Sequence, residues 1–343
     1  MKRRWIEFGA VGLAALALGA CSAGSDEASD SAVVNTLPPL IKKASYRVGF
    51  VQVWEDNSPW RSANTASIQA EAAKRGYELV FETGSGFGAT DEVARMYAVI
   101  AAKVDAILIA PQDPTVLAPS IVAARRAGIP VFLEDRSIDT EIAIPGLDYV
   151  SYLGSDFVKE GASAAQWLIA HPPAAAVKIL ELEGTIGSSP AVDRKNGFDA
   201  EIAKHPAFKI VASESANFDP AEGYATIKTM LAAHPEANVI FSHNDNMALG
   251  VIRALTELGK QPGDIPIISV DGEKEGIQAM KDGWISAIAE CNPRFGPISF
   301  DTIEQYADGQ QIPLTVKNID RLFDASTPDA RAALDDYLQN EAF

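Results

Sequence analysis

Short runs of β-branched and other apolar residues alternate with amphipathic stretches along the chain from Tyr46 onward. The apolar runs predict strands over 46–53, 77–82, 105–110, 129–134, 149–153, 177–182, 208–213, 239–242 and 265–270. Between them, apolar residues recur every three or four positions, for example over 63–74 and 116–127, and this spacing predicts helices. Gly76 and Gly128 follow two of these helices, in the position where a left-handed residue ends a helix.

Nearly continuous apolar strands that alternate with helices are typical of parallel sheets covered by helices on both faces. The strands fall into two similar sets, and a chain of 343 residues is too long for one small core. We therefore predict an α/β fold with two doubly wound parallel-sheet lobes. In such sheets, ligands bind beyond the carboxyl ends of the strands.

The first residues predict export from the cytoplasm. Three basic residues at positions 2–4 precede an apolar stretch over 8–18, which is shorter than the roughly 20 residues that span a bilayer. Residues 1–20 are therefore predicted to be a signal peptide. Leu-Gly-Ala directly before Cys21 resembles the bacterial lipobox, and this resemblance predicts a lipidated Cys21; the alternative is an ordinary secretory signal with a chance cysteine. Residues 21–44 are predicted to be a flexible tether, because their first half is rich in small and polar residues.

The charge of the chain argues against nucleic acid as a partner. The formal net charge is −17, and because residues 1–20 carry three basic side chains and one acidic one, the remainder stands at −19. A surface of that charge repels phosphate groups, which need clustered lysines and arginines. Cys21 and Cys291 are the two cysteines, so a lipidated Cys21 leaves Cys291 without a disulfide partner.

No cofactor, metal or catalytic motif is predicted from the sequence. The four histidines show no close metal-ligand spacing. The glycine-rich segment 84–88 lacks the Lys-Ser/Thr of a P-loop and the third glycine of a dinucleotide fingerprint, so we interpret it as a turn. No Gly-x-Ser-x-Gly elbow occurs, and Cys291 lacks the sequence context of a nucleophile.

Polar residues and an aromatic residue follow five of the predicted strands, in one case after a glycine-bearing loop. They are Trp54 to Arg61, Asp135-Arg136, Asp193-Arg194, His243-Asn244-Asp245 and Asp271-Gly272. A sugar hydroxyl both donates and accepts hydrogen bonds, which suits arginine, aspartate and asparagine, and the apolar face of a sugar ring packs on an aromatic such as Trp60. Each residue also has a purely structural interpretation: Asn244 suits a helix N-cap, and an exposed Asp193-Arg194 pair contributes little. The prediction rests on the agreement of all five strand ends.

Four segments resemble the type I periplasmic sugar-binding proteins of ABC importers, and the resemblance runs from about Tyr46 to near the C-terminus. These segments are 130–139, 181–198, 243–250 and 269–272. The chain is most similar to the galactofuranose-binding branch, through Trp60-Arg61, 135–139 and 184–187. The predicted ligand-binding residues are Asn57, Ser58, Trp60, Arg61, Asp135, Arg136, Arg194, Phe218, Asn244 and Asp271.

The resemblance implies two hinge-closing lobes joined by three crossovers, near Tyr149, Cys291 and Ile319. One lobe is then expected to comprise residues 45–149 plus 291–319, and the other residues 150–290 plus 320–343. Two features depart from the family. The segment 55–59 is longer and more acidic than expected, and Glu290-Cys291-Asn292 stands where ribose-type members carry an amide.

By this resemblance the chain is expected to be a monomeric solute-binding lipoprotein with no catalytic residue, on the periplasmic face or another extracytoplasmic surface of a bacterial membrane. It would deliver a monosaccharide, with galactofuranose or a related furanose or pentose favoured, to an ABC permease. A sugar-sensing co-receptor for a chemotaxis or sensor-kinase system is an open alternative.

A lipoprotein glycosidase that uses two of Asp135, Asp193, Asp245 and Asp271 is a weaker alternative. The arginine after Asp135 and after Asp193 disfavours the protonated carboxyl that a general acid needs. A sugar-responsive repressor would need a basic helix-turn-helix where this chain has its signal peptide. The sequence leaves the sugar, the permease and the membrane open.

Overall fold

The computed structural model describes residues 36–52, 58–83 and 89–343, which belong to one compact unit, Asn35–Phe343. The predicted signal peptide, the lipidation site Cys21 and the predicted ligand-binding residue Asn57 lie outside the described residues.

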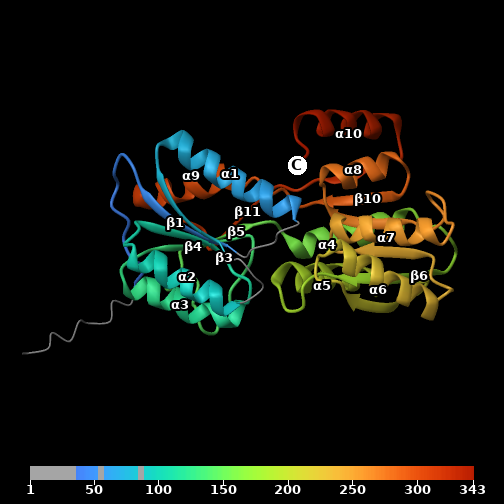
Figure 1. The fold of residues 1–343 in the computed structure, drawn as a ribbon, viewed down its shortest axis with the longest axis horizontal. Helices are drawn as coiled ribbons and strands as arrows, with labels where there is room; N and C mark the ends of the chain where they lie inside the picture. The colour runs from blue at the N-terminus through green and yellow to red at the C-terminus, as the bar shows by residue number, and fades with distance from the viewer. Residues whose placement is uncertain (1–35, 53–57, 84–88) are drawn as a thin grey trace, which may run out of the picture. The chain divides into compact units, whose positions relative to one another are not determined.

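The first of two sheets has six parallel strands in the order β11-β5-β4-β3-β1-β2 (Figure 1). They are β1 (Arg47–Gln52), β2 (Glu78–Thr83), β3 (Ala106–Ala110), β4 (Val131–Glu134), β5 (Ser151–Gly154) and β11 (Thr315–Lys317). Helices α1 (Pro59–Arg75) and α9 (Gly296–Ala307) cover one face, and α2 (Ala89–Ala101) and α3 (Pro114–Arg126) cover the other.

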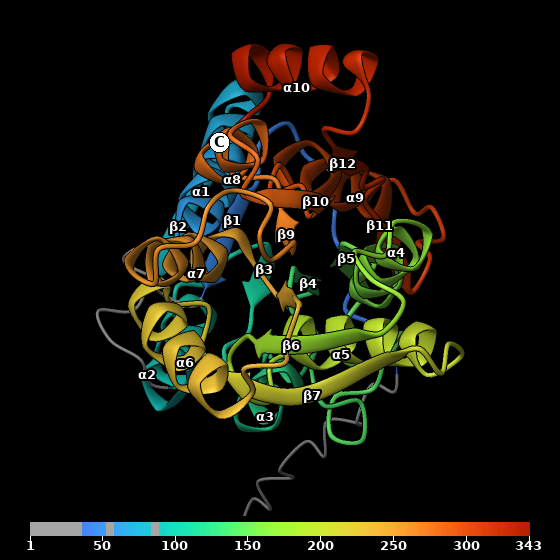
Figure 2. The same cartoon turned by 90° about the vertical axis from the view of Figure 1, so that its right-hand side faces the viewer.

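The second sheet also has six strands, in the order β12-β10-β9-β8-β6-β7 (Figure 2). They are β6 (Val177–Glu183), β7 (Phe208–Ser215), β8 (Val239–Ser242), β9 (Ile267–Asp271), β10 (Ile285–Glu290) and β12 (Leu322–Asp324), and β12 is antiparallel to β10. Helices α4 (Phe157–Ala170) and α5 (Ser189–Ile202) cover one face. The other face is covered by α6 (Pro220–Ala233), α7 (Asp245–Glu257) and α8 (Lys274–Lys281), and α10 (Pro328–Asn340) packs against α8.

The apolar runs form buried strands because both faces of each sheet are covered. All five residues of β3 are buried; Leu108 belongs to the core under α1 and α9, whereas Ile107 and Ile109 belong to the core under α2 and α3. Gly76 and Gly128 have φ angles of +69° and +80°, the left-handed conformation expected of them after a helix. The predicted fold, two doubly wound α/β lobes, is confirmed.

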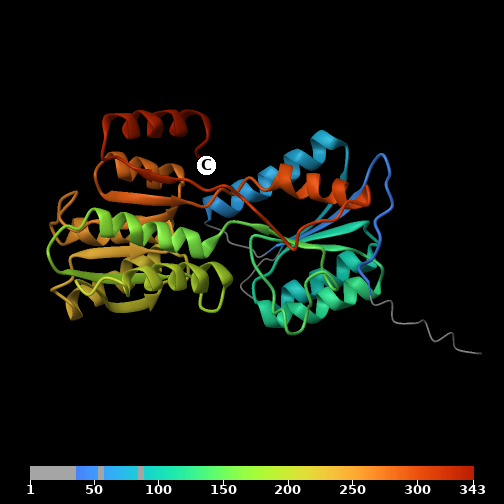
Figure 3. The same cartoon turned by 180° about the vertical axis from the view of Figure 1, so that it is seen from behind.

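Three segments pass between the two sheets (Figure 3). They follow Gly154, join Glu290 to Gly296, and join Lys317 to Leu322. The expected lobe boundary after residue 149 therefore needs correction, because β5 pairs with β4 on one side and with β11 on the other. An interior strand with partners on both edges belongs to the first sheet, so the first crossover lies after Gly154.

The segment before β1 is the second correction. Leu37 and Leu40 pack against the core of the first lobe, and the Tyr306 hydroxyl donates to the Pro38 carbonyl at 2.7 Å. Lys43 pairs with Asp105 at 2.6 Å. The prediction that the tether extends to residue 44 is therefore wrong, because burial of the two leucines stabilises the packing of this segment on the first lobe.

Candidate ligand-binding site

A cavity lies where residues from both lobes and from the second crossover meet. Its lining residues are Ser58, Trp60, Arg61, Asp135, Arg136, Pro190, Arg194, Phe218, Asn244, Asp271 and Cys291. The structure thus brings nine of the ten predicted ligand-binding residues together, and the tenth, Asn57, lies outside the described residues. Pro190 and Cys291 were not predicted to line a site.

In the first lobe, Arg61 and Asp135 form a buried ion pair at the wall of the cavity. The Arg61 guanidinium donates to the Asp135 carboxylate and, at 3.2 Å, to the Asn64 side-chain oxygen. Arg61 stands in the first turn of α1, where its backbone N–H donates to the N-cap Ser58 at 3.0 Å. Asp135 has a φ of +60°, and the Tyr152 hydroxyl donates to its carbonyl at 2.7 Å. The tight turn after β4 thereby aims the carboxylate at α1.

Trp60 forms an aromatic wall of the cavity and is only 6% exposed. Its indole N–H donates to the Cys291 carbonyl at 2.6 Å, and its ring meets Phe295 edge-on at 5.9 Å. The Arg61 guanidinium stacks 4.8 Å from the ring centre. The indole is therefore held by a polar contact at one end and by packing on its faces.

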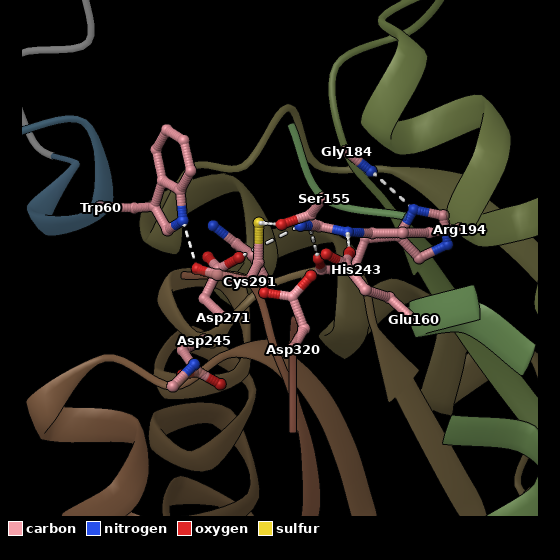
Figure 4. Close-up of polar contacts among 12 residues, drawn as sticks. Trp60, Ser155, Glu160, Gly184, Arg194, His243, Asp245, Asp271, Cys291 and Asp320 are labelled. Atoms are coloured by element: carbon pink, nitrogen blue, oxygen red, sulfur yellow. Dashed lines mark hydrogen bonds and ion pairs between the residues drawn. The ribbon is translucent and has the colours of Figure 1, made fainter. Parts of the chain in front are cut away.

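In the second lobe, Arg194 on α5 is the centre of a buried polar cluster (Figure 4). Its guanidinium donates to Glu160 on α4 at 2.7 Å, to the His243 carbonyl at 2.6 Å and to Asp271 at 3.2 Å. Burial raises the pKa of Glu160 to about 7, although Arg194 opposes the shift. Burial also raises the pKa of Asp271 well above its usual range. Three acceptors therefore fix one guanidinium at the cavity wall.

Two glycines let α4 and α5 approach closely enough for the Glu160–Arg194 pair. A Cβ placed on Gly161 would stand 2.0 Å from the Arg194 carbonyl oxygen, and one on Gly197 would stand 2.0 Å from the Val158 carbonyl oxygen. The two helix backbones are thus in direct contact at these positions.

Phe218 and Asn244 complete the wall of the second lobe. The Phe218 ring lies against Gly184, where an added Cβ would meet the ring at 1.9 Å. Asn244 caps α7 by accepting a hydrogen bond from the Met247 N–H at 3.0 Å, and it also lines the cavity. Asn244 therefore has both roles: it is the N-cap of α7 and it lines the cavity.

Sequence reasoning missed Glu160 and wrongly expected Arg194 to lower the pKa of Asp193. No sequence pattern marks Glu160, whose burial depends on the contact between α4 and α5. Asp245 accepts hydrogen bonds from the backbone N–H groups of Gly272 and Glu273, both at 2.9 Å, so it braces the loop after β9. Asp193 is half-buried and does not line the cavity. Burial raises its pKa, contrary to the expected influence of Arg194, whose guanidinium is paired with Glu160 and Asp271.

The described ranges contain no group of three or more His, Cys, Asp or Glu side chains able to hold a metal ion. Among the described residues, no helix is both long enough and apolar enough to cross a bilayer.

His243 supports the site from behind. Its ring accepts from the Gly184 N–H at 3.4 Å and donates to Glu181 at 3.1 Å, and burial lowers its pKa below the usual 6.5. The folded protein therefore holds a neutral ring that the unfolded chain protonates first, so its contribution to stability is lost as the pH falls below about 6.5.

We expect that acidification from pH 7.5 to 5.5 destabilises the wild type relative to His243→Gln, by up to about 1.4 kcal/mol per pH unit. Denaturant titrations at four pH values measure this difference. Glu160 and Asp245, whose pKa values burial raises to about 7, act in the opposite direction in both proteins and cancel in the comparison. Equal pH profiles for the two proteins would contradict the assignment.

Comparison with known proteins places the chain in a family. The family described as periplasmic binding protein domain matches residues 48–311. The galactofuranose-binding protein of Escherichia coli K12 is 34% identical over 287 residues, which are 82% of this chain and 89% of that protein. The ribose import binding protein of Salmonella typhimurium is 33% identical over 257 residues, 75% and 83% of the two chains.

Solved structures agree with this placement. The crystal structure of a galactofuranose binding protein superposes with a TM-score of 0.80 at 32% identity, covering 87% of this chain and 100% of that one. A protein from Mycobacterium smegmatis in complex with β-D-fucofuranose superposes with a TM-score of 0.79 at 36% identity, covering 86% and 94%. The chain belongs to the periplasmic binding protein domain family, and it is a binding protein rather than an enzyme.

Proposed function

We propose that this protein binds a neutral monosaccharide in its furanose form between its two lobes and delivers it to an ABC importer. Galactofuranose or a related furanose or pentose is the favoured ligand. The observation that carries the proposal is the pairing inside one cavity of two guanidinium–carboxylate sets, Arg61 with Asp135 and Arg194 with Asp271, together with Trp60 and Phe218.

The charge balance of the cavity supports a neutral ligand. Because each guanidinium already has a carboxylate partner, the site presents many donors and acceptors without a strong excess of either charge. The paired hydroxyls of a sugar match such a surface, and its C–H faces match the two aromatic walls.

The relatives support a furanose. Proteins at 32% to 36% identity are named for galactofuranose or were crystallised with β-D-fucofuranose, and one at 33% with α- and β-L-arabinofuranose as part of an arabinose ABC transporter. We extend this ligand class to the present chain because paired arginines and carboxylates and two aromatic side chains line its cavity. These groups suit the hydroxyls and the C–H faces of a furanose ring.

Closure of the two lobes is the proposed mechanism. A sugar that first contacts one lobe gains the hydrogen bonds of the other on closure, and it shifts the population only by that difference in affinity. The permease would then recognise the closed form. We further propose that a lipid on Cys21 anchors the protein at the extracytoplasmic face of a membrane, where it acts as a monomer.

A thermal-shift screen of residues 35–343, which retain the packed Leu37 and Leu40, tests the proposed function. The panel comprises galactose, arabinose, fucose, ribose, xylose and glucose. A ligand of the folded state raises the melting temperature by mass action, by roughly 5 °C or more at a hundred-fold excess over Kd. We expect one furanose-forming sugar to do so, and the shift to be lost in Arg136→Ala.

Arg253→Ala is the matched control, because its side chain is 68% exposed on α7 and does not line the cavity. It should keep the full sugar-induced shift. Absence of a shift with every sugar, in a well-folded protein, would overturn the proposed function.

A further inference from the structure

Hydrogen bonds at Cys291 and Asn292 join the second crossover to the other two (Figure 4). Its thiol donates to the Ser155 hydroxyl at 3.7 Å, and Ser155 belongs to the first crossover. The Asp320 carboxylate in the third crossover accepts a hydrogen bond from the Asn292 N–H in the second at 3.1 Å. A chain of contacts thus runs through all three segments on which hinge motion must turn.

Cys291 also contacts ligand-site residues from both lobes. Its carbonyl accepts from the Trp60 indole at 2.6 Å, and its N–H donates to the Asp271 carbonyl at 3.0 Å. Trp60 belongs to α1 in the first lobe, and Asp271 ends β9 in the second. Small shifts of residue 291 are therefore transmitted to both walls of the cavity.

The thiol is suited to this position by its burial. Cys291 is 1% exposed and Ser155 is 2% exposed, so the contact between the two side chains is buried. Burial raises the pKa of the Cys291 thiol well above its usual range, which keeps it protonated and able to donate. A serine hydroxyl at position 291 would donate in the same direction.

We propose that Cys291 and Ser155 form a positioning pair. By holding the first and second crossovers together, the pair fixes the positions of the two cavity walls. The inference rests on the proposed function in one respect: the site that the pair positions is the proposed sugar site. The thiol–hydroxyl contact holds the second crossover against the first, and this register places Trp60 and Asp271 for the ligand.

Ser155 makes the inference testable, because it does not line the cavity. Loss of affinity in Ser155→Ala must therefore act through another residue. The affinity for each sugar of the thermal-shift panel is measured by calorimetric titration of the wild type, Ser155→Ala, Cys291→Ala and the double variant. Each single variant should bind its sugar roughly three- to ten-fold more weakly than the wild type. The double variant should lose no more affinity than the single variant with the larger loss, since both changes break the same contact. Cys291→Ser should recover most of the affinity that Cys291→Ala loses, because the donor is kept.

A second measurement needs no sugar. In the full chain carrying Cys21→Ser, Cys291 is the one thiol, and its rate of reaction with a maleimide reports opening at the crossovers. We expect Ser155→Ala, added to the Cys21→Ser chain, to raise this rate several-fold above that of the Cys21→Ser chain alone. Ser163→Ala, which changes a half-buried serine of α4 that no described hydrogen bond joins to Cys291, should leave the rate unchanged.

The outcomes separate the two proposals. A wild type that binds no sugar overturns the proposed function, while a faster maleimide reaction in Ser155→Ala still supports the positioning pair. Unchanged sugar affinity in both single variants, additive losses in the double variant, or equal maleimide rates in Ser155→Ala and Ser163→Ala each overturn the pair.

Discussion

Replacing Arg194 by alanine is expected to weaken sugar binding by roughly 2–5 kcal/mol, the largest loss at any single position of the site. The guanidinium is 3% exposed and serves Glu160, Asp271 and the His243 carbonyl at once. Its removal leaves buried acceptors without a donor, so the free energy of unfolding should also fall by about 3–5 kcal/mol. Calorimetric titration and denaturant unfolding measure the two effects separately.

Arg253→Ala provides the control for charge and size. That arginine pairs with Glu257 on an exposed helix face, so its loss should change stability by no more than about 0.5 kcal/mol and leave binding intact. A variant of Arg194 that loses stability but binds sugar as the wild type does would remove Arg194 from the binding site and leave it a structural role.

Replacing Gly161 by alanine is expected to destabilise the protein and to weaken sugar binding with it. Alanine is favoured over glycine in a helix by about 1 kcal/mol, so propensity alone predicts the opposite sign. The new Cβ, however, would stand 2.0 Å from the Arg194 carbonyl oxygen, a backbone atom that cannot rotate away. Separation of α4 from α5 should lower the free energy of unfolding by roughly 1–3 kcal/mol and shift Arg194 from its partners.

Ser163→Ala, two residues further along the same helix, controls for the substitution of a half-buried helical position. It should unfold and bind as the wild type does, because it leaves the α4–α5 contact unchanged. An alanine at position 161 that stabilises the protein would show that helix propensity outweighs the clash, and that the two helices can separate at little cost.

The sequence was most informative where hydrophobic spacing is a local property. The apolar runs of β1, β3 and β9 are predictable because strands buried on both faces must be apolar throughout. The residues at strand ends were predictable for the same reason, since parallel strands bring their carboxyl ends to one edge of a sheet. This is why Asp135 and Asp271, which are 136 residues apart in the chain, both reach the cavity.

The later elements were harder to predict. β11 and β12 have three residues each, and Phe323 is the single buried residue of the two strands, so neither carries a burial pattern long enough for a sequence window to detect. Their pairing with β5 and β10 depends on where the crossovers return the chain. The boundary near residue 149 failed for a related reason, because only the partner strands reveal which sheet β5 joins.

By itself, the sequence determined the class of fold and the chemical character of the site, since strand periodicity and the residues after each strand are encoded over a few positions. The tertiary structure alone decided which carboxylate each arginine meets, and that Cys291 lies among the three crossovers. Those contacts join residues tens to hundreds of positions apart. They depend on helix approach and burial, which no local pattern of side chains records.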